Sequence, residues 1–199
     1  VRAHLGAKPG DFLVGYCGLH GLAQGLEVVI GAAEKLRDRP NIQIVMIGDG
    51  PTKQKLVAMA NEKGLSNLRF FEYQPKKEIP AILASCDASL IPLSTRLPGT
   101  MPSKVYEALA AGVPGLVAKG CEGEALVRQF NTGRAFEALD ADELAEAIVQ
   151  LAQDPQECHR IRANCTELAK RFDRDAIADR TEMVLTALAA GQPLPHVSW

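Results

Sequence analysis

The residues from Ala88 to Ala118, ASLIPLSTRLPGTMPSKVYEALAAGVPGLVA, decide the fold of this chain. The stretch begins and ends with short apolar runs, Ala88–Pro92 and Gly115–Ala118, which are typical of buried strands. Between them the chain forms a loop and then a short helix, which we place at Ser103–Ala111. A strand, a helix and a second strand in this order predict two parallel strands joined by a helical crossover.

The start and stop signals of this helix fix its place. Pro102 is a favourable residue at a helix start, and the Ser103 hydroxyl is able to cap the free backbone N–H groups there. Gly112 and Pro114 stand where a helix ends, because glycine accepts the left-handed conformation and proline cannot continue the helix.

The same helix carries a pattern suited to a nucleoside diphosphate. Free N–H groups and the positive dipole end at Ser103, Lys104 and Val105 predict a phosphate site, which the Lys104 ammonium strengthens. Glu107 lies one turn deeper, roughly 6 Å along the axis at about 1.5 Å per residue. The ribose hydroxyls of the ligand lie at a similar remove, and a carboxylate accepts two hydroxyl hydrogen bonds at once. The alternative for Glu107 is a solvated helix residue.

Short apolar runs alternate with amphipathic segments along the rest of the chain. Further strands are expected at Phe12–Cys17, Ile42–Ile47, Leu68–Glu72 and Thr132–Phe136. Further helices are expected around Leu26–Ala33, Thr52–Lys63 and Glu78–Ser85. This alternation predicts an α/β fold, a Rossmann-like parallel sheet with helices on both faces. Ligands bind such sheets beyond the carboxyl ends of the strands, where the strand order reverses.

The C-terminal part is expected to be helical. Asp140 and Glu143 form a capping pair ahead of one amphipathic helix. Pro155–Ala190 is helical throughout, with a break at Phe172 and Asp173. We therefore expect one domain over residues 1–190 and an irregular tail over residues 191–199.

Composition fits a compact α/β domain and argues against several other classes. A chain of 199 residues with 47% hydrophobic content can bury one substantial core. The net charge of −2 shows no basic excess, so no nucleic-acid partner is expected. The five cysteines and four histidines show no metal-ligand spacing, so we expect no metal and a reduced, cytoplasmic compartment. No apolar run reaches the roughly 18 residues of a transmembrane segment.

Several motifs together resemble retaining glycosyltransferases of the GT-B type, group 1, family four. Pro102-Ser103-Lys104, Glu107 and Ala110-Ala111-Gly112-Val113-Pro114 resemble the donor-binding helix of that family. Segments in matching order and spacing are Gly18–Glu27, Ile47–Pro51 and Ala84–Pro92. The resemblance covers nearly the whole chain. It implies the C-terminal half of a GT-B architecture, which binds the nucleotide sugar, with the N-terminal acceptor domain absent.

The resemblance also implies which residues bind the donor. They are Gly18, His20, Gly21 and Gln24 after the first strand, Tyr73 and Gln74 after the third, and Ser103, Lys104 and Glu107 on the helix. The glycines of the first loop would let a diphosphate approach the backbone closely, although such a loop can also be a flexible connector. No catalytic residue is predicted.

The chain departs from the family pattern in its first loop. Relatives carry an Arg and a Lys there for the diphosphate, where this chain has His20 and Gln24. Lys104 and Arg96 are the nearest cations that could replace them.

A second departure concerns the donor sugar. The family pattern of two glutamates separated by seven residues matches Glu107 with its second member, while the first falls on Gly99. Some members that use N-acetylated UDP sugars resemble this chain in having Pro-Ser-Lys ahead of the second glutamate, so we expect a UDP-linked amino sugar. Glu124 resembles a residue near the donor in relatives, and is equally well explained as an acid at a helix N-terminus.

The activity implied by the resemblance is transfer of a sugar to a glycan or lipid-linked acceptor, as in polysaccharide biosynthesis. The donor is then a substrate, and no cofactor is expected. The chain alone is expected to be inactive without the acceptor domain, through which the full-length enzyme could associate peripherally with a membrane. Two alternatives stay open: a stand-alone, non-catalytic nucleotide-binding module, and a GT-B type sugar-nucleotide epimerase.

Overall fold

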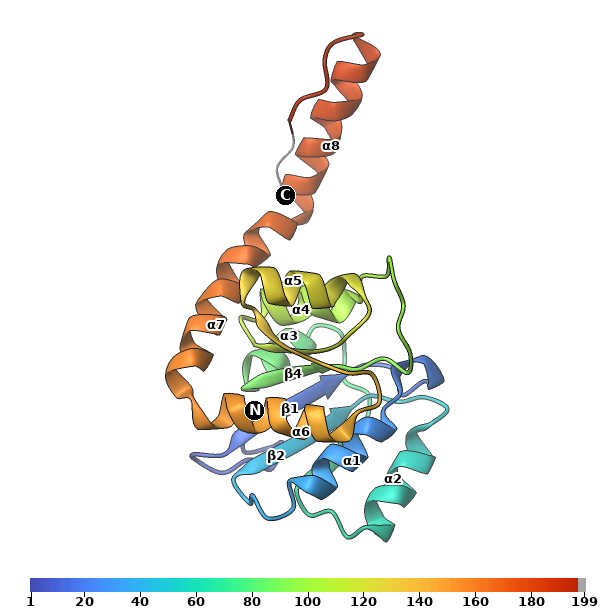
Figure 1. The fold of residues 1–199 in the computed structure, drawn as a ribbon, viewed down its shortest axis with the longest axis vertical. Coiled ribbons are helices and arrows are strands. Elements are labelled where there is room, and N and C mark those ends of the chain that lie inside the picture. Colours follow the sequence, from blue (N-terminus) through green and yellow to red (C-terminus); the bar gives the residue numbers. More distant parts are fainter. Residues whose placement is uncertain (197–199) are drawn as a thin grey trace.

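The computed structural model describes residues 1–196, which form one parallel sheet wrapped by helices (Figure 1). Within these residues, six strands pair in the order β3-β2-β1-β4-β5-β6. Their bounds are β1 Phe12–Cys17, β2 Ile42–Ile47, β3 Leu68–Phe71, β4 Ala88–Ile91, β5 Gly115–Ala118 and β6 Gly133–Phe136. The predicted α/β class is confirmed, and each strand boundary lies within one residue of its predicted place.

Alternation along the central strands explains why both faces of the sheet are covered. In β1, Val14 and Tyr16 belong to one buried apolar cluster, whereas Leu13 and Cys17 belong to another. Successive side chains of a strand point to opposite faces, so these two clusters lie on opposite sides of the sheet here. All six residues of β2 are buried. Such strands require a helical layer on each side.

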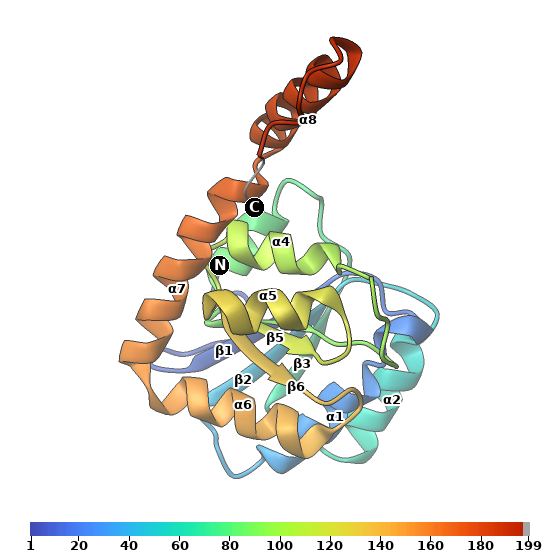
Figure 2. The same cartoon turned by 45° about the horizontal axis from the view of Figure 1, so that its top comes forward.

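Six helices follow the strands in turn and supply these layers. They are α1 Glu27–Lys35, α2 Lys53–Glu62, α3 Ile79–Ala84, α4 Ser103–Ala110, α5 Glu122–Phe130 and α6 Ala141–Gln153. Helix α6 packs beside α1, and α3 packs beside α4. Figure 2 shows α1, α2 and α6 on one side of the strands and α4 and α5 on the other.

The C-terminal helices leave the sheet. Helix α7, Pro155–Ala169, packs against both α6 and α4, and so joins the two helical layers. A 3-10 turn at Lys170–Phe172 precedes α8, Arg174–Ala189, which the Asp173 carboxylate caps. The break predicted at Phe172 and Asp173 is confirmed. Helix α8 extends away from the body of the domain (Figure 1). Residues 191–196 are irregular as predicted, and residues 197–199 of the predicted tail lie outside the described residues.

Two capping predictions need correction. Ser103 does not cap α4, because Pro102 occupies the cap position in an extended conformation and no side chain bonds there. Asp140 does cap α6, accepting from two backbone N–H groups. The Glu143 carboxylate, however, pairs with Lys119 at 2.6 Å instead of returning to Asp140.

Helix α5 was not among the helices placed from the sequence, although an acid at a helix N-terminus was the alternative given for Glu124. Its large apolar residues, Leu126, Val127 and Phe130, pack against the core but are confined to the second half of a nine-residue helix, which is shorter than the window in which periodicity is read. All five cysteines are unpaired. Among the described residues, no helix is both long enough and apolar enough to cross a membrane.

Candidate functional site

A cleft opens where the strand order reverses. In the sheet, β2 and β3 lie on one side of β1, and β4 lies on its other side. The loops that follow β1 and β4 therefore lead away from each other between these two neighbouring strands. Doubly wound sheets bind their ligands there. The cleft has a volume of about 390 Å³. Five of the nine predicted donor-binding residues line it: Gly18, Tyr73, Gln74, Lys104 and Glu107.

Close backbone contact between the loops after β1 and β2 forms one wall of the cleft. The Gly18 N–H donates to Ile47 O at 2.9 Å, and the His20 N–H donates to Asp49 O at 2.8 Å. Gly48 has a φ of 138°, and a Cβ there would overlap the Gly18 carbonyl oxygen. Position 48 therefore needs glycine, and this part of the wall is bare backbone.

Helix α4 brings a cation and a carboxylate to the cleft. Val105, Ala108 and Leu109 are buried, and this apolar stripe fixes the rotation of the helix. Lys104 and Glu107 are three residues apart and therefore share another face. Both line the cleft.

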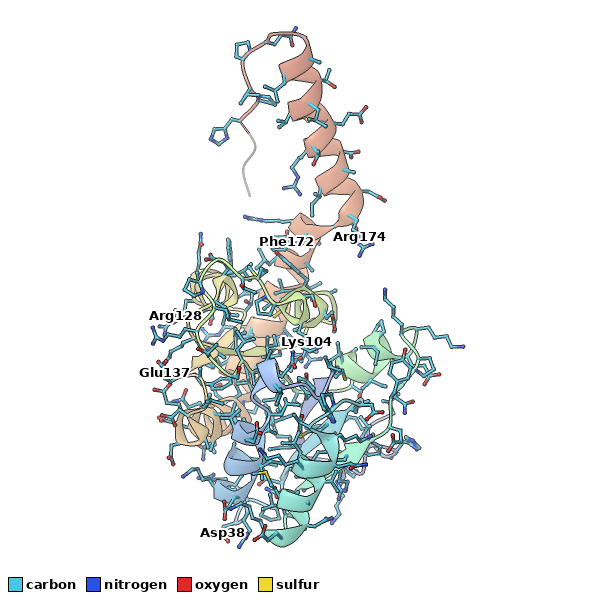
Figure 3. The ribbon with its side chains drawn as sticks, turned by 90° about the vertical axis from the view of Figure 1, so that its right-hand side faces the viewer. Asp38, Lys104, Arg128, Glu137, Phe172 and Arg174 are labelled. Carbon is cyan, nitrogen blue, oxygen red and sulfur yellow. The ribbon has the colours of Figure 1, made fainter. Side chains whose placement is uncertain are left out.

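Lys104 extends from α4 toward the end of β1. Its Nζ lies 5.3 Å from the centroid of the Tyr16 ring, within reach of a cation–π interaction. The Tyr16 hydroxyl donates to Leu19 O at 2.6 Å, and burial raises the pKa of Tyr16, so this hydroxyl stays protonated. A Cβ on Gly18 would collide with the ammonium. Figure 3 shows Lys104 between α4 and the body of the domain.

The start of α4 offers two free N–H groups where three were predicted. The Val105 N–H donates to Pro102 O at 3.0 Å, which leaves those of Ser103 and Lys104. The Ser103 side chain is exposed and is not part of the cleft lining. Its Oγ lies 3.5 Å from the Glu107 carboxylate.

His20 is placed differently from the prediction. None of its surface is exposed, so the imidazole does not reach the cleft. The loop turns inward here because both backbone groups of His20 bind the segment after β2. Burial, and secondly the Lys53 ammonium, hold the pKa of His20 below its usual value.

Gly21 and Gln24 also lie away from the cleft lining. Gly21 is buried and precedes a 3-10 helix at Leu22–Gln24. The Gln24 side chain folds back onto it, since a Cβ at Gly21 would lie 2.6 Å from Gln24 Oε1.

Arg96 and Glu124 are both engaged within the protein. The Arg96 guanidinium forms a two-pronged contact with Glu137, at 2.8 and 3.0 Å, and does not line the cleft. Glu124 accepts from the Gly120 N–H at 2.7 Å and from Arg128 at 3.0 Å, in the first turn of α5. In this structure the Arg96 guanidinium is thus engaged in an ion pair, and Glu124 lies in the first turn of a helix, as its alternative interpretation describes.

The cleft also contains two charged residues that the sequence did not single out. Asp49 follows β2 and Lys76 follows β3, so both belong to loops at the correct edge of the sheet. Their place in loops at this edge of the sheet is the feature of the sequence that could have identified them. In the loop before α4, the Gly99 N–H donates to Glu122 Oε1 at 3.1 Å. A carboxylate thus stands beside Gly99, the position on which the first glutamate of the expected family pattern falls.

The cleft suits a phosphorylated, hydroxyl-bearing ligand. Lys104, Lys76 and the first N–H groups of α4 supply positive charge, and Glu107 supplies a hydrogen-bond acceptor. Within residues 1–196, no group of three or more His, Cys, Asp or Glu side chains could hold a metal ion. The fold and the site define a doubly wound α/β domain with a cleft at its switch point, lined by apolar residues and by a few charged ones.

The chain belongs to the family described as glycosyl transferases group 1, whose sequence model matches residues 1–168. The resemblance found in the motifs is therefore confirmed.

Two curated relatives support this assignment. The putative colanic acid biosynthesis glycosyl transferase WcaI of Escherichia coli K12 is 39% identical over 113 residues, which cover 56% of this chain and 28% of that protein. A GDP-mannose-dependent phosphatidylinositol monomannoside mannosyltransferase of Mycolicibacterium smegmatis is 29% identical over 139 residues, covering 67% and 36%. The chain thus spans about a third of the length of these relatives.

The fold matches solved glycosyltransferase structures. Anabaena Alr3699/HepE, crystallised with UDP and glucose, superposes with a TM-score of 0.81 at 23% identity, over 94% of this chain and 51% of that one. WaaG, a glycosyltransferase of lipopolysaccharide biosynthesis, gives 0.72 at 22% identity, over 85% and 45%. At these identities the likeness establishes the fold, one Rossmann-like half of a GT-B architecture.

Proposed function

We propose that this chain is the donor-binding domain of a retaining glycosyltransferase and holds a nucleoside diphosphate sugar in the cleft. The observation that carries the proposal is the presence of Lys104 and Glu107 on one face of α4, both lining the cleft. A cation at the start of the helix and a carboxylate one turn later match the phosphate and the ribose of a single ligand.

Each part of the donor has a place in this arrangement. The diphosphate lies at the first turn of α4, beside Lys104 and the bare backbone of Gly18. The ribose bonds to Glu107, and the base lies toward Tyr73 and Gln74. When an acceptor hydroxyl attacks the anomeric carbon from the face that the diphosphate leaves, the bond to the diphosphate breaks, negative charge grows on the leaving oxygen, and that oxygen takes up the hydroxyl proton. Fixed N–H dipoles and the ammonium stabilise that charge without reorganising.

The donor that we propose is a UDP-linked amino sugar. The fold match to HepE, which was crystallised with UDP, supports uridine. The mycobacterial relative is named for GDP-mannose, so guanine is the competing base. Because the relatives are longer, we assign acceptor binding to a further, N-terminal domain and residues 1–190 to the donor domain. We further propose that the full-length enzyme is cytoplasmic and acts in polysaccharide biosynthesis. If its acceptor is lipid-linked, the enzyme associates peripherally with a membrane.

Family membership favours a transferase over the two alternatives. The described relatives are named as transferases, and none as an epimerase or a binding module. An epimerase would also need an acid–base pair at the sugar, and the sequence identifies no such pair.

We expect this chain to bind UDP weakly, with a Kd in the millimolar to high micromolar range, because only half of an interdomain cleft is present. Calorimetric titration with UDP, GDP, ADP and their sugars should show the strongest binding for the uridine compounds. Preference for guanine would overturn the donor assignment, and no heat with any nucleotide at millimolar concentration would overturn the proposed function.

Removal of divalent metal is expected to leave this affinity unchanged within about twofold, or roughly 0.4 kcal/mol. The physical reason is that Lys104 and the α4 N–H groups supply the positive charge themselves. The measurement is the UDP titration repeated in EDTA and again with added Mg²⁺ or Mn²⁺. A large loss on chelation would show that a metal ion carries the diphosphate.

A further inference from the structure

His20 is a buried titratable residue that the proposed donor site does not use. Its N–H donates to Asp49 O at 2.8 Å. Its carbonyl oxygen accepts from the Thr52 N–H at 3.0 Å and from the Thr52 hydroxyl at 2.7 Å. His20 thus ties the loop after β1 to the turn after β2. These are the two segments whose backbones form the cleft wall at Gly18 and Gly48.

The imidazole fills an aromatic space beneath that wall. Its centroid lies 5.7 Å from the Tyr16 ring and 6.3 Å from the Phe70 ring. The side chain is fully buried, and neither ring nitrogen has a hydrogen-bond partner among the described residues. Tyr16 is also the ring over which the Lys104 ammonium lies. The imidazole therefore packs against the same Tyr16 ring that the Lys104 ammonium contacts.

The charges that face His20 would not accommodate an imidazolium. Lys53 of α2 opposes a positive charge, while Asp49 and Glu72 favour one. Glu72 is already paired with Lys53 at 2.8 Å, and Asp49 accepts the Gly50 N–H at 2.7 Å. Tyr16 faces the ring as a neutral phenol. No acceptor reaches a ring nitrogen, so a protonated ring would be a buried charge without a partner.

We infer that His20 is a positioning residue whose neutral ring supports the cleft wall, and that protonation of this ring releases the wall and weakens nucleotide binding. The part about nucleotide binding rests on the proposed function. The loop can open locally, because Gly18 and Gly21 flank this segment and Leu19 and Leu22 are already exposed.

The direction of the pH effect follows from linkage. The pKa of His20 is lowered in the closed fold, whereas an exposed histidine has a pKa near about 6.5. As the pH falls through about 6.5, His20 therefore takes up a proton in the open or unfolded states before it does so in the closed fold. Between pH 7.5 and 5.5 this favours the open or unfolded states by at most about tenfold, which is the limit for a closed state that binds no proton. The protein loses stability and affinity on the acid side.

The first test compares UDP affinity at pH 7.5 and 5.5 in the wild type, in His20→Phe and in His159→Gln. Phe keeps an aromatic ring and cannot titrate, while His159 is an exposed histidine of α7 outside the cleft. Ionisation of UDP itself affects all three proteins equally. Wild type and His159→Gln should lose more affinity in acid than His20→Phe, by no more than the limit of about tenfold set by linkage. Equal losses in all three would overturn the inference.

A second test needs no ligand and separates this inference from the proposed function. Urea unfolding of the same proteins at both pH values should show the wild-type unfolding constant rising more in acid than that of His20→Phe, by up to about tenfold. His20→Asn, which is polar and does not titrate, serves if the Phe variant does not fold. If UDP binds nowhere but this difference appears, the proposed function fails and the support by His20 stands. If the difference is absent, the inference about His20 fails.

Discussion

Gly48→Ala should destabilise the domain by about 3 kcal/mol or more and abolish nucleotide binding. A Cβ at this position would lie 2.9 Å from the Gly18 carbonyl carbon and closer still to its oxygen. Neither neighbour can move freely. The Gly18 N–H bonds to Ile47 O at 2.9 Å, and the Gly48 N–H bonds to Phe71 O at 3.2 Å. Relief of the clash must therefore separate β1 from β2 at the edge that forms the cleft. Urea denaturation and UDP calorimetry measure the two effects.

Gly64→Ala is the matched control for this variant. Gly64 also has a positive φ, 62°, but a Cβ there meets nothing within 4 Å. Only the backbone strain remains, which costs about 1 to 2 kcal/mol. This variant should keep its UDP affinity. Equal loss of stability in both variants would mean that the close approach of the two loops contributes nothing.

The fold could be predicted because its signals are local. β2 is a continuous buried run, IQIVMI, and β1 is nearly so, which is the pattern of a strand covered on both faces. Asp173 likewise marks a helix start through its own neighbours. In α5 the local signal is too short to be read, since its large apolar residues, Leu126, Val127 and Phe130, are confined to the second half of a nine-residue helix.

The site could be predicted only to the level of its loops. Strand order and loop position locate the cleft, and the short helix places Lys104 and Glu107 in it. Side-chain direction within an irregular loop depends on contacts that are distant in sequence. His20 turns inward because the segment after β2 binds its backbone, and Arg96 turns away because Glu137, 41 residues later, holds its guanidinium. Neither contact leaves a pattern in the sequence.

Glu107→Gln should weaken UDP binding by about 1 to 3 kcal/mol, the worth of charge-assisted bonds to two hydroxyls. Glu107 is exposed on α4, so the substitution keeps the shape of the helix and should leave the fold intact. The decisive ligand is a 2′,3′-dideoxy analogue of UDP, which has no ribose hydroxyls to offer. It should bind the wild type and the variant alike. Glu62→Gln, at an exposed helical glutamate outside the cleft, should change neither affinity.

Lys104→Ala should weaken the binding of both ligands, whereas Glu107→Gln should weaken only that of UDP. This difference distinguishes the phosphate-binding end of α4 from the ribose-binding end. The ammonium acts on the phosphate end, so both UDP and its dideoxy analogue should lose affinity, and the loss should shrink as salt screens the attraction. Circular dichroism and urea unfolding check that loss of the contact with Tyr16 leaves the fold in place. If Glu107→Gln penalises the dideoxy analogue as much as UDP, Glu107 does not bind the ribose. If the loss in Lys104→Ala is independent of salt, the ammonium supports the loop at Gly18 and does not attract the diphosphate.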